Sequence, residues 1–325
     1  MNLSAAKRFI ESHTEFVLAA HRSPDGDTLG SCLALRLALL RLQKKATVTC
    51  VDPVPPYLRF LPGSETVTQS LKSAPEAAIY IDCADHARAD ALEPVLESAP
   101  HRFCIDHHET NPRQTKDGDW VEPVGATAEL IARLIEALGV PLDRDIATCL
   151  FTGIATDTGN FSYSNTTPDT FRIAAELVRE GIELPELNRR LFRAMSVPKG
   201  RLVAHTLERM ALYENDSVAV SCITQSDLER CGASEADCEG LIDYLRDLEP
   251  VEIACTLRES ADGKIRVSLR SKRGADVSRI ASAFGGGGHR RAAGCTTDGP
   301  MERASEMLLK ELIEAIHTWK ASLPS

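Results

Sequence analysis

Short apolar runs alternate with helical patterns along the first half of the chain. Residues 16–20 form an apolar run, and after Thr28 the leucines at Leu29, Leu33, Leu37 and Leu40 fall on one side of a helix. Further strands are expected at residues 46–51, 76–82 and 103–105, and further helices at 3–13, 85–92, 126–138, 145–155 and from 168. Because strands that alternate with helices form parallel sheets covered on both faces, the pattern predicts an α/β fold with a doubly wound, mostly parallel sheet.

The pattern changes after about residue 185. Helices are expected at residues 185–194 and 199–212, then strands at 217–223, 251–257 and 264–269, and helices at 276–284 and 301–319. A chain of 325 residues is long enough for two domains that each bury a core. We therefore expect an N-terminal domain at residues 1–190 and a second, smaller mixed α/β domain at residues 191–325.

Aspartates and histidines, which are residue types that can bind metals, follow four apolar runs of the N-terminal domain. They are His21, Asp25 and Asp27 after the first run, then Asp82, the triplet Asp106-His107-His108, and Asp157. In open α/β sheets, ligands bind in the crevice outside the carboxyl ends of the strands. A single aspartate of this kind is usually a helix cap or a turn residue, and a cap at Asp25 explains the first stretch by itself. Four segments that all end in Asp or His favour a site for divalent cations.

The net charge of -10 limits the partners that the protein can have. A protein that coats long duplex nucleic acid carries a basic surface, whereas a short nucleotide needs only a local cationic pocket. No apolar stretch is long enough to cross a membrane, and the first seven residues lack the pattern of a signal peptide. The ten cysteines form no Cys-x-x-Cys motif and are typical of reduced thiols, which indicates a cytoplasmic protein.

Five motifs together resemble the DHH phosphoesterases, a family named for the sequence at residues 106–108. They are His21-x-x-x-Asp25-x-Asp27, Asp82, Asp106-His107-His108, Asp157-Thr158-Gly159-x-Phe161 and Gly285-Gly286-Gly287-Gly288-His289-x-x-Ala292-Ala293-Gly294. The last motif resembles the family's DHH-associated nucleic-acid-binding domain. The resemblance spans nearly the whole chain and is greatest to the short bacterial branch that acts on oligoribonucleotides and on 3′-phosphoadenosine 5′-phosphate (pAp).

The resemblance implies a centre of two divalent metal ions, with manganese favoured and magnesium or cobalt as alternatives. One metal is held by His21, Asp25 and Asp82, and the other by Asp27, Asp82, His107 and Asp157, so that Asp82 bridges them. Four carboxylates at one place repel one another, and two divalent cations cancel their charges. Mixed imidazole and carboxylate ligands suit manganese better than calcium.

The resemblance also assigns residues to the reaction itself. Adjacent residues on an extended segment point opposite ways, so His107 and His108 need not both be ligands. In this family the second histidine, His108, faces the substrate phosphate, and Asp106 orients a histidine or nearby backbone, with a turn cap as the alternative. The C-terminal domain holds the far end of the substrate. Its expected substrate-binding residues are Arg270, whose guanidinium matches phosphate oxygens, and Gly286, Gly287, Gly288 and His289.

The activity implied is hydrolysis of phosphoester bonds in small nucleotides, which releases mononucleotides from short RNA and AMP from pAp. The expected partners are short RNA oligonucleotides and small nucleotides. Long duplexes and membranes are not expected as partners, and the sequence leaves open whether the protein forms a homodimer. Two other enzymes fit parts of the pattern: a linear or cyclic dinucleotide phosphodiesterase, and a manganese-dependent inorganic pyrophosphatase. The glycine motif argues against the pyrophosphatase, whose second domain differs. A nucleotide sensor without turnover has no need for the complete set of metal ligands.

Overall fold

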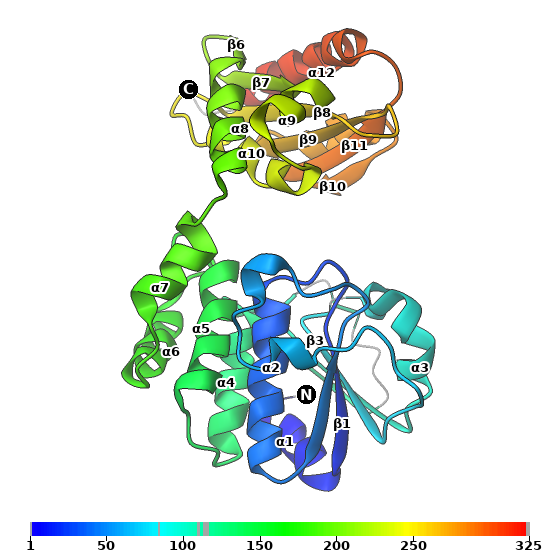
Figure 1. Ribbon diagram of the computed structural model, residues 1–325, viewed down its shortest axis with the longest axis vertical. Helices are drawn as coiled ribbons and strands as arrows, with labels where there is room; N and C mark the ends of the chain where they lie inside the picture. Colours follow the sequence, from blue (N-terminus) through cyan, green and yellow to red (C-terminus); the bar gives the residue numbers. More distant parts are fainter. Residues whose placement is uncertain (1, 84, 109–110, 113–116, 323–325) are drawn as a thin grey trace. The chain divides into compact units, whose positions relative to one another are not determined.

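The computed structural model describes residues 2–83, 85–108, 111–112 and 117–322. The chain divides into two compact units, Met1–Ala194 and Met195–Ser325 (Figure 1). Each unit has its own hydrophobic core. The division after Ala194 lies close to the boundary that the sequence places after residue 190.

The N-terminal unit is built on a sheet of five parallel strands. In spatial order these are β2 (Lys45–Thr49), β1 (Glu15–Ala19), β3 (Ala77–Ile81), β4 (His101–Asp106) and β5 (Asp119–Val121). β1 and β3 are neighbours, yet the chain leaves β1 toward one edge of the sheet and leaves β3 toward the other. Two strands whose connections diverge in this way leave a crevice at their carboxyl ends, where ligands bind in doubly wound sheets.

Helices cover both faces of this sheet, which confirms the expected doubly wound fold. They are α1 (Leu3–Ser12), α2 (Gly26–Arg41), α3 (Glu93–Glu97), α4 (Thr127–Ala137), α5 (Arg144–Asp157), α6 (Pro168–Arg179) and α7 (Leu184–Asn188). The 3₁₀ segments η1 (Pro56–Leu58), η2 (Ser64–Thr66) and η3 (His86–Leu92) and the π-helical segment η4 (Arg189–Arg193) complete the unit. The larger core lies under α1, α2, α4, α5 and α6, and η3 with α3 packs on the opposite face (Figure 1). Because both faces are covered, β3 is buried throughout and its sequence is an uninterrupted apolar run.

The C-terminal unit contains a six-stranded mixed sheet. The sequence predicts a mixed α/β domain and three of these strands, at residues 217–223, 251–257 and 264–269. In spatial order the strands of the sheet are β10 (Gly287–His289), β11 (Ala292–Thr297), β9 (Ile265–Ser271), β8 (Ile253–Glu259), β7 (Val218–Ile223) and β6 (Ala211–Tyr213). β7 and β8 are parallel, and the other pairs are antiparallel. The helices are α8 (Val197–Glu208), α9 (Gln225–Cys231), α10 (Leu241–Arg246), α11 (Val277–Ala283) and α12 (Met301–Ala321), with η5 (Glu235–Cys238). α11 and α12 cover one face, while α8, α9 and α10 pack on the other face over β7 and β8.

Several segments of the C-terminal unit differ from the sequence prediction, which includes neither the helices α9 and α10 nor the strand β11. The helix expected at 199–212 ends at Glu208, and Ala211–Tyr213 pairs with β7 instead. The turn at residues 214–216 has positive φ at all three positions, which brings the chain back on itself and lets strand pairing satisfy the backbone groups. The glycine run forms strand β10 opposite β11, which the sequence pattern does not predict.

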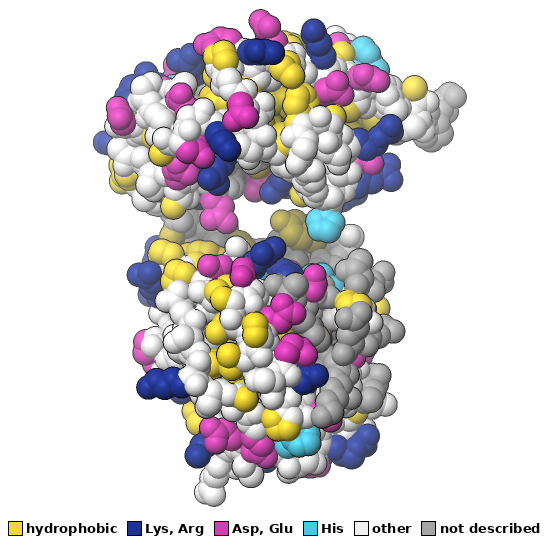
Figure 2. Space-filling view, turned by 90° about the vertical axis from the view of Figure 1, so that its right-hand side faces the viewer, with side chains coloured by type: hydrophobic (Ala, Val, Ile, Leu, Met, Phe, Trp, Pro, Cys, Tyr) yellow, Lys and Arg dark blue, Asp and Glu magenta, His cyan; other side chains and the backbone are white. Residues whose placement is uncertain are grey.

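The surface of the C-terminal unit carries both signs of charge. On the face drawn in Figure 2, Lys and Arg side chains lie among Asp and Glu side chains instead of forming one basic surface. This distribution agrees with the net charge of -10 for the whole chain. None of the described helices has the length and apolar character needed to cross a membrane.

Candidate metal centre

The loop between β1 and α2 places His21 and Asp25 at the carboxyl end of the sheet. Asp25 is the N-cap of α2, and its Oδ1 accepts the backbone N–H groups of Asp27 and Thr28, each at 3.0 Å. Its other oxygen, Oδ2, lies 3.7 Å from Nε2 of His21. The helix cap and the metal ligand are therefore compatible explanations of Asp25, because each uses a different oxygen.

His21 is buried, and its two ring nitrogens have different neighbours. Nδ1 lies 2.7 Å from the backbone oxygen of Arg22, to which it can donate, and Nε2 is directed at Asp25 and Asp82. Burial opposes a proton on this ring, but the two carboxylates outweigh burial and raise the pKa of His21 to about 9. A ring nitrogen that attracts a proton between two carboxylates is also well placed to bind a divalent cation.

Asp82 follows β3 and lies between the two expected groups of ligands. Its backbone φ is 58°, in the left-handed region that residues with a side chain adopt only with strain. Its Oδ2 is 3.5 Å from Nε2 of His21, and its Oδ1 is 3.5 Å from Nε2 of His107. The two oxygens thus face different histidines, one from each of the two expected groups of ligands.

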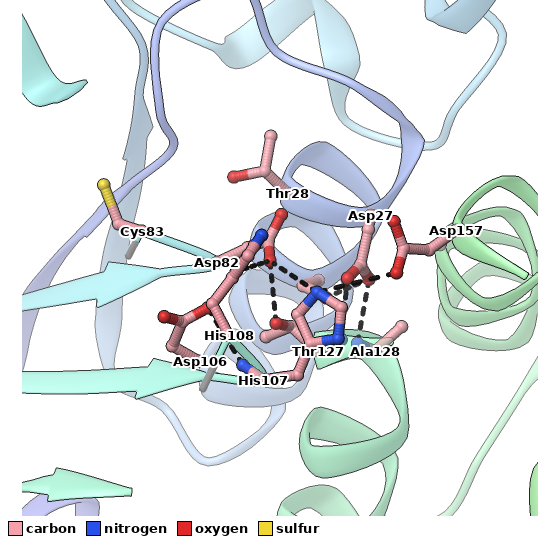
Figure 3. Close-up of polar contacts among 12 residues, drawn as sticks. Asp27, Thr28, Asp82, Cys83, Asp106, His107, His108, Thr127, Ala128 and Asp157 are labelled. Atoms are coloured by element: carbon pink, nitrogen blue, oxygen red, sulfur yellow. Dashed lines mark hydrogen bonds and ion pairs between the residues drawn. The ribbon is translucent and has the colours of Figure 1, made fainter. Parts of the chain in front are cut away.

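The second group converges from α2, from the residue after β4 and from the end of α5 (Figure 3). It comprises Asp27, His107 and Asp157, and Nε2 of His107 lies 3.5 Å from Oδ2 of Asp157. Burial and the charges of Asp82 and Asp157 raise the pKa of Asp27 well above its ordinary value. Burial also raises the pKa of Asp157 to about 6. Bound cations would remove the repulsion that these carboxylates otherwise experience.

Three sets of described residues bring their potential ligand atoms within 4.8 Å of one another. The sets are His21 with Asp25 and Asp82, Asp27 with His107 and Asp157, and Asp82 with His107 and His108. The first two sets contain all six residues that the sequence assigns to the metals. Their nitrogen and oxygen donors fit manganese, magnesium or cobalt.

Asp106 is fully buried at the end of β4 and orients His108. Its Oδ1 accepts the backbone N–H of His107 at 2.9 Å and lies 2.8 Å from Nδ1 of His108, and its Oδ2 accepts Nδ2 of Asn111 at 2.7 Å. The hydrogen bond to Asp106 raises the pKa of His108. With Nδ1 directed at Asp106, Nε2 is the nitrogen of His108 that can act on a substrate.

The two histidine rings do not point to opposite sides. Their centroids are 4.5 Å apart, because β4 ends at Asp106 and the alternation of an extended strand does not continue through His107 and His108. The histidines differ in their hydrogen-bond partners instead. Nδ1 of His107 lies 3.1 Å from the backbone oxygen of Val124, whereas Nδ1 of His108 faces Asp106.

Sequence reasoning misses Thr127 and Asn111. The hydroxyl of Thr127 donates to Oδ1 of Asp82 at 2.9 Å, and its backbone N–H donates to Oδ2 of Asp27 at 2.6 Å. The sequence around residue 126 marks the start of a helix, but it carries no sign that this helix begins against Asp27. Asn111 follows the Asp-His-His triplet closely, and that proximity is the one available hint of its contact with Asp106.

Arg270 and His289 share one face of the C-terminal sheet. In the strand register His289 lies opposite Ala292, and Ala292 lies opposite Arg270. Directly paired residues point to the same side of a sheet, so a small alanine separates the side chains of Arg270 and His289. Leu269, next to Arg270, points into the core on the other side.

The glycines at residues 286–288 differ in how closely their neighbours pack against them. A Cβ atom at Gly286 would lie 2.2 Å from the backbone oxygen of Gly294, and one at Gly288 would lie 2.5 Å from that of Ala292. The close approach of residues 286–288 to the backbone of β11 therefore requires glycine at Gly286 and Gly288, independently of any ligand. At Gly287 an added Cβ would meet nothing within 4 Å, so packing does not explain the glycine at that position.

Known proteins resemble this chain in sequence and in fold. The model of the N-terminal domain of the DHH family matches residues 15–154, and that of the DHHA1 domain matches residues 215–319. A Thermus thermophilus protein named bifunctional oligoribonuclease and PAP phosphatase NrnA is 36% identical over 303 residues, which cover 92% of this chain and 89% of that protein. The crystal structure of an exopolyphosphatase-related protein from Bacteroides fragilis has a TM-score of 0.88 at 26% identity and covers 98% of this chain and 96% of its own. The crystal structure of an exonuclease RecJ bound to manganese matches 100% of this chain and 95% of its own chain, with a TM-score of 0.53 at 15% identity. This match shows that the two folds are similar.

Proposed function

The chain belongs to the DHH family, and from that premise we propose that it hydrolyses short oligoribonucleotides to mononucleotides and pAp to AMP. Membership of this family makes it a hydrolase that acts on phosphoester bonds. The observation that carries the proposal is the convergence of six ligand-type side chains beside the carboxyl ends of β1 and β3. The T. thermophilus relative, which is named for both activities, supports the choice of substrates.

Two divalent ions would be held by the ligand sets described above, with Asp82 shared between them. Such ions would bring positive charge beside the oxygens of the phosphate and lower the pKa of an attacking water. The RecJ exonuclease, whose fold is similar, is bound to manganese, which supports manganese as the first ion to test. Asp82 and the three other aspartates of these sets together contribute four negative charges, which balance two divalent ions.

His108 is proposed to give a proton to the leaving oxygen. Asp106 holds its Nδ1 at 2.8 Å and favours the protonated ring, so that Nε2–H is available as a donor. Asp106 in turn is held by Asn111, which limits its rotation. The pair therefore resembles other histidine–aspartate pairs in which the carboxylate orients the ring and stabilises its charge.

We expect the affinity for Mn²⁺ to increase as the pH rises toward 9. In the metal-free protein the pKa of His21 is about 9, so at pH 7 the ring carries a proton that Nε2 must lose before it binds a metal. Raising the pH removes this competition, and lowering the pH strengthens it. Calorimetric titration at pH 7 and pH 9, in two buffers of different ionisation enthalpy, measures both the affinity and the protons released. Equal affinities without proton release at pH 7 would contradict the role of His21.

In the C-terminal unit, Arg270 and His289 are proposed to bind a phosphate other than the one being hydrolysed. We expect Arg270→Ala to raise KM about ten- to a hundredfold for pAp and for a trinucleotide, because a charged hydrogen bond to phosphate is lost. Bis-p-nitrophenyl phosphate has no second phosphate, and its hydrolysis should change little. Steady-state kinetics on the three substrates measures the difference.

Arg303→Ala is the matched control for this prediction. Arg303 is an exposed arginine on α12, which packs on the opposite face of the same sheet. Its removal changes the net charge as Arg270→Ala does but leaves the face of Arg270 intact. Equal losses on all three substrates in the Arg270 variant would mean that Arg270 supports the fold and does not bind substrate.

A panel of substrates tests the proposed function against its alternatives. Initial rates are measured with Mn²⁺ on pAp, a trinucleotide, a long RNA, pGpG, a cyclic dinucleotide and pyrophosphate, and the products are identified. We expect AMP from pAp and mononucleotides from the trinucleotide, both faster than cleavage of the long RNA. Fastest turnover of pyrophosphate or of a cyclic dinucleotide would instead establish one of the other two enzymes.

A further inference from the structure

Thr127, the first residue of α4, touches both sides of the candidate metal centre. It is fully buried. Its backbone N–H donates to Asp27 at 2.6 Å, and its hydroxyl donates to Asp82 at 2.9 Å. We propose that Thr127 is a positioning residue, which sets the orientation of the bridging carboxylate of Asp82 relative to Asp27.

The contact with Asp27 takes the place of an ordinary helix cap. The N-cap of α4 is Ala126, whose methyl group cannot accept the first N–H groups of the helix. Asp27, 100 positions earlier in the chain, accepts the N–H of Thr127 and, at 2.9 Å, that of Ala128. A carboxylate also suits the positive end of a helix. The backbone of α4 therefore holds Asp27, and this contact does not depend on the side chain at position 127.

The hydroxyl contact has a different role, which depends on the threonine side chain. A buried threonine inside a helix can donate to the carbonyl four residues earlier, as Thr152 does to Thr148 at 2.9 Å in α5. Thr127 is the first residue of its helix, and its hydroxyl donates to Oδ1 of Asp82 instead. The hydroxyl of Thr127 therefore holds a residue of the metal centre and makes no hydrogen bond to the backbone of α4, which the structure describes in full.

The hydroxyl selects one orientation of the Asp82 carboxylate. Rotation about the last bond of an aspartate has broad minima, so the strained backbone of Asp82 does not by itself decide where each oxygen points. With Oδ1 held by Thr127, that oxygen faces His107, and Oδ2 faces His21. This is the arrangement in which one carboxylate serves two ions.

The inference rests on the proposed two-metal function and is tested on metal binding as well as activity. Thr127→Val keeps the volume and both backbone N–H contacts but lacks the hydroxyl. Thr127→Ala also lacks it and adds no bulk, and Thr127→Ser retains it. Thr152→Val removes an equally buried hydroxyl from the same unit and controls for a general loss of stability.

Each full-length protein is stripped of metal and titrated with Mn²⁺, and bound ions are followed by electron paramagnetic resonance. We expect the Val and Ala variants to bind the second equivalent about 10- to 100-fold more weakly and to lose the spectrum of a coupled ion pair. The Ser and Thr152→Val variants should match the wild type.

Normal binding and an unchanged spectrum in both the Val and Ala variants would overturn the inference. The same loss in Thr152→Val, or in Thr127→Ser, would also overturn it. A wild-type protein that binds fewer than two ions would overturn the proposed function, and the inference with it.

Discussion

Asp82→Asn is expected to lower kcat/KM for pAp by roughly a thousandfold or more, because a neutral amide cannot bridge and neutralise two cations. Asparagine has the size of aspartate and tolerates the left-handed backbone that Asp82 adopts at φ 58°. The fold should therefore survive, and thermal unfolding followed by circular dichroism checks that it does. Steady-state kinetics with saturating Mn²⁺ then measures the loss of activity separately from any loss of stability.

Asp90→Asn is the control for this substitution. Asp90 also has a positive φ, 52°, but its side chain is exposed and lies 3.6 Å from Arg22. Its replacement makes the same chemical change at another aspartate with positive φ, outside the ligand sets. Near wild-type turnover in Asp82→Asn would exclude the bridging role, and an equal loss in Asp90→Asn would show that the effect is not specific to the centre.

His108→Gln is expected to slow hydrolysis of pAp and of a trinucleotide by about 10²- to 10⁴-fold, the range for loss of a general acid. The loss should be much smaller on bis-p-nitrophenyl phosphate, because nitrophenolate leaves without a proton. Initial rates on the three substrates give the comparison. Metal binding should change little, since Nδ1 of His108 is directed at Asp106.

His101→Gln is the matched control, because His101 lies at the other end of the same strand β4. It should hydrolyse all three substrates at wild-type rates. If His108→Gln loses the same factor on the nitrophenyl ester as on pAp, then His108 contributes to binding or charge stabilisation and does not donate a proton to the leaving group.

Much of the fold could be predicted because parallel strands that are buried on both faces consist of consecutive apolar residues, which are visible in the sequence. β3 is apolar at all five positions and ends directly before Asp82, so both the strand and its polar end are visible in the chain. The same logic applies to β4 and Asp106. Since adjacent parallel strands deliver their carboxyl ends to one edge, the sequence also indicates that these polar residues lie together.

Other features depend on contacts between distant segments and leave no local pattern. The hydroxyl of Thr127 reaches Asp82 across 45 positions, and a helix start predicts nothing about such a partner. β10 has three exposed residues and gains its strand conformation by pairing with β11. The two oxygens of Asp82 face different histidines. This orientation likewise depends on a backbone conformation that aspartate rarely adopts.

The most direct test is to strip the protein of metal with a chelator, remove the chelator, and measure AMP release from pAp as Mn²⁺ is added back. The ligand sets joined by Asp82 predict no turnover without metal and a rate that reaches its maximum at two ions per chain. Turnover that persists in the chelator, or a rate that is complete at one ion per chain, would contradict a two-metal phosphoesterase.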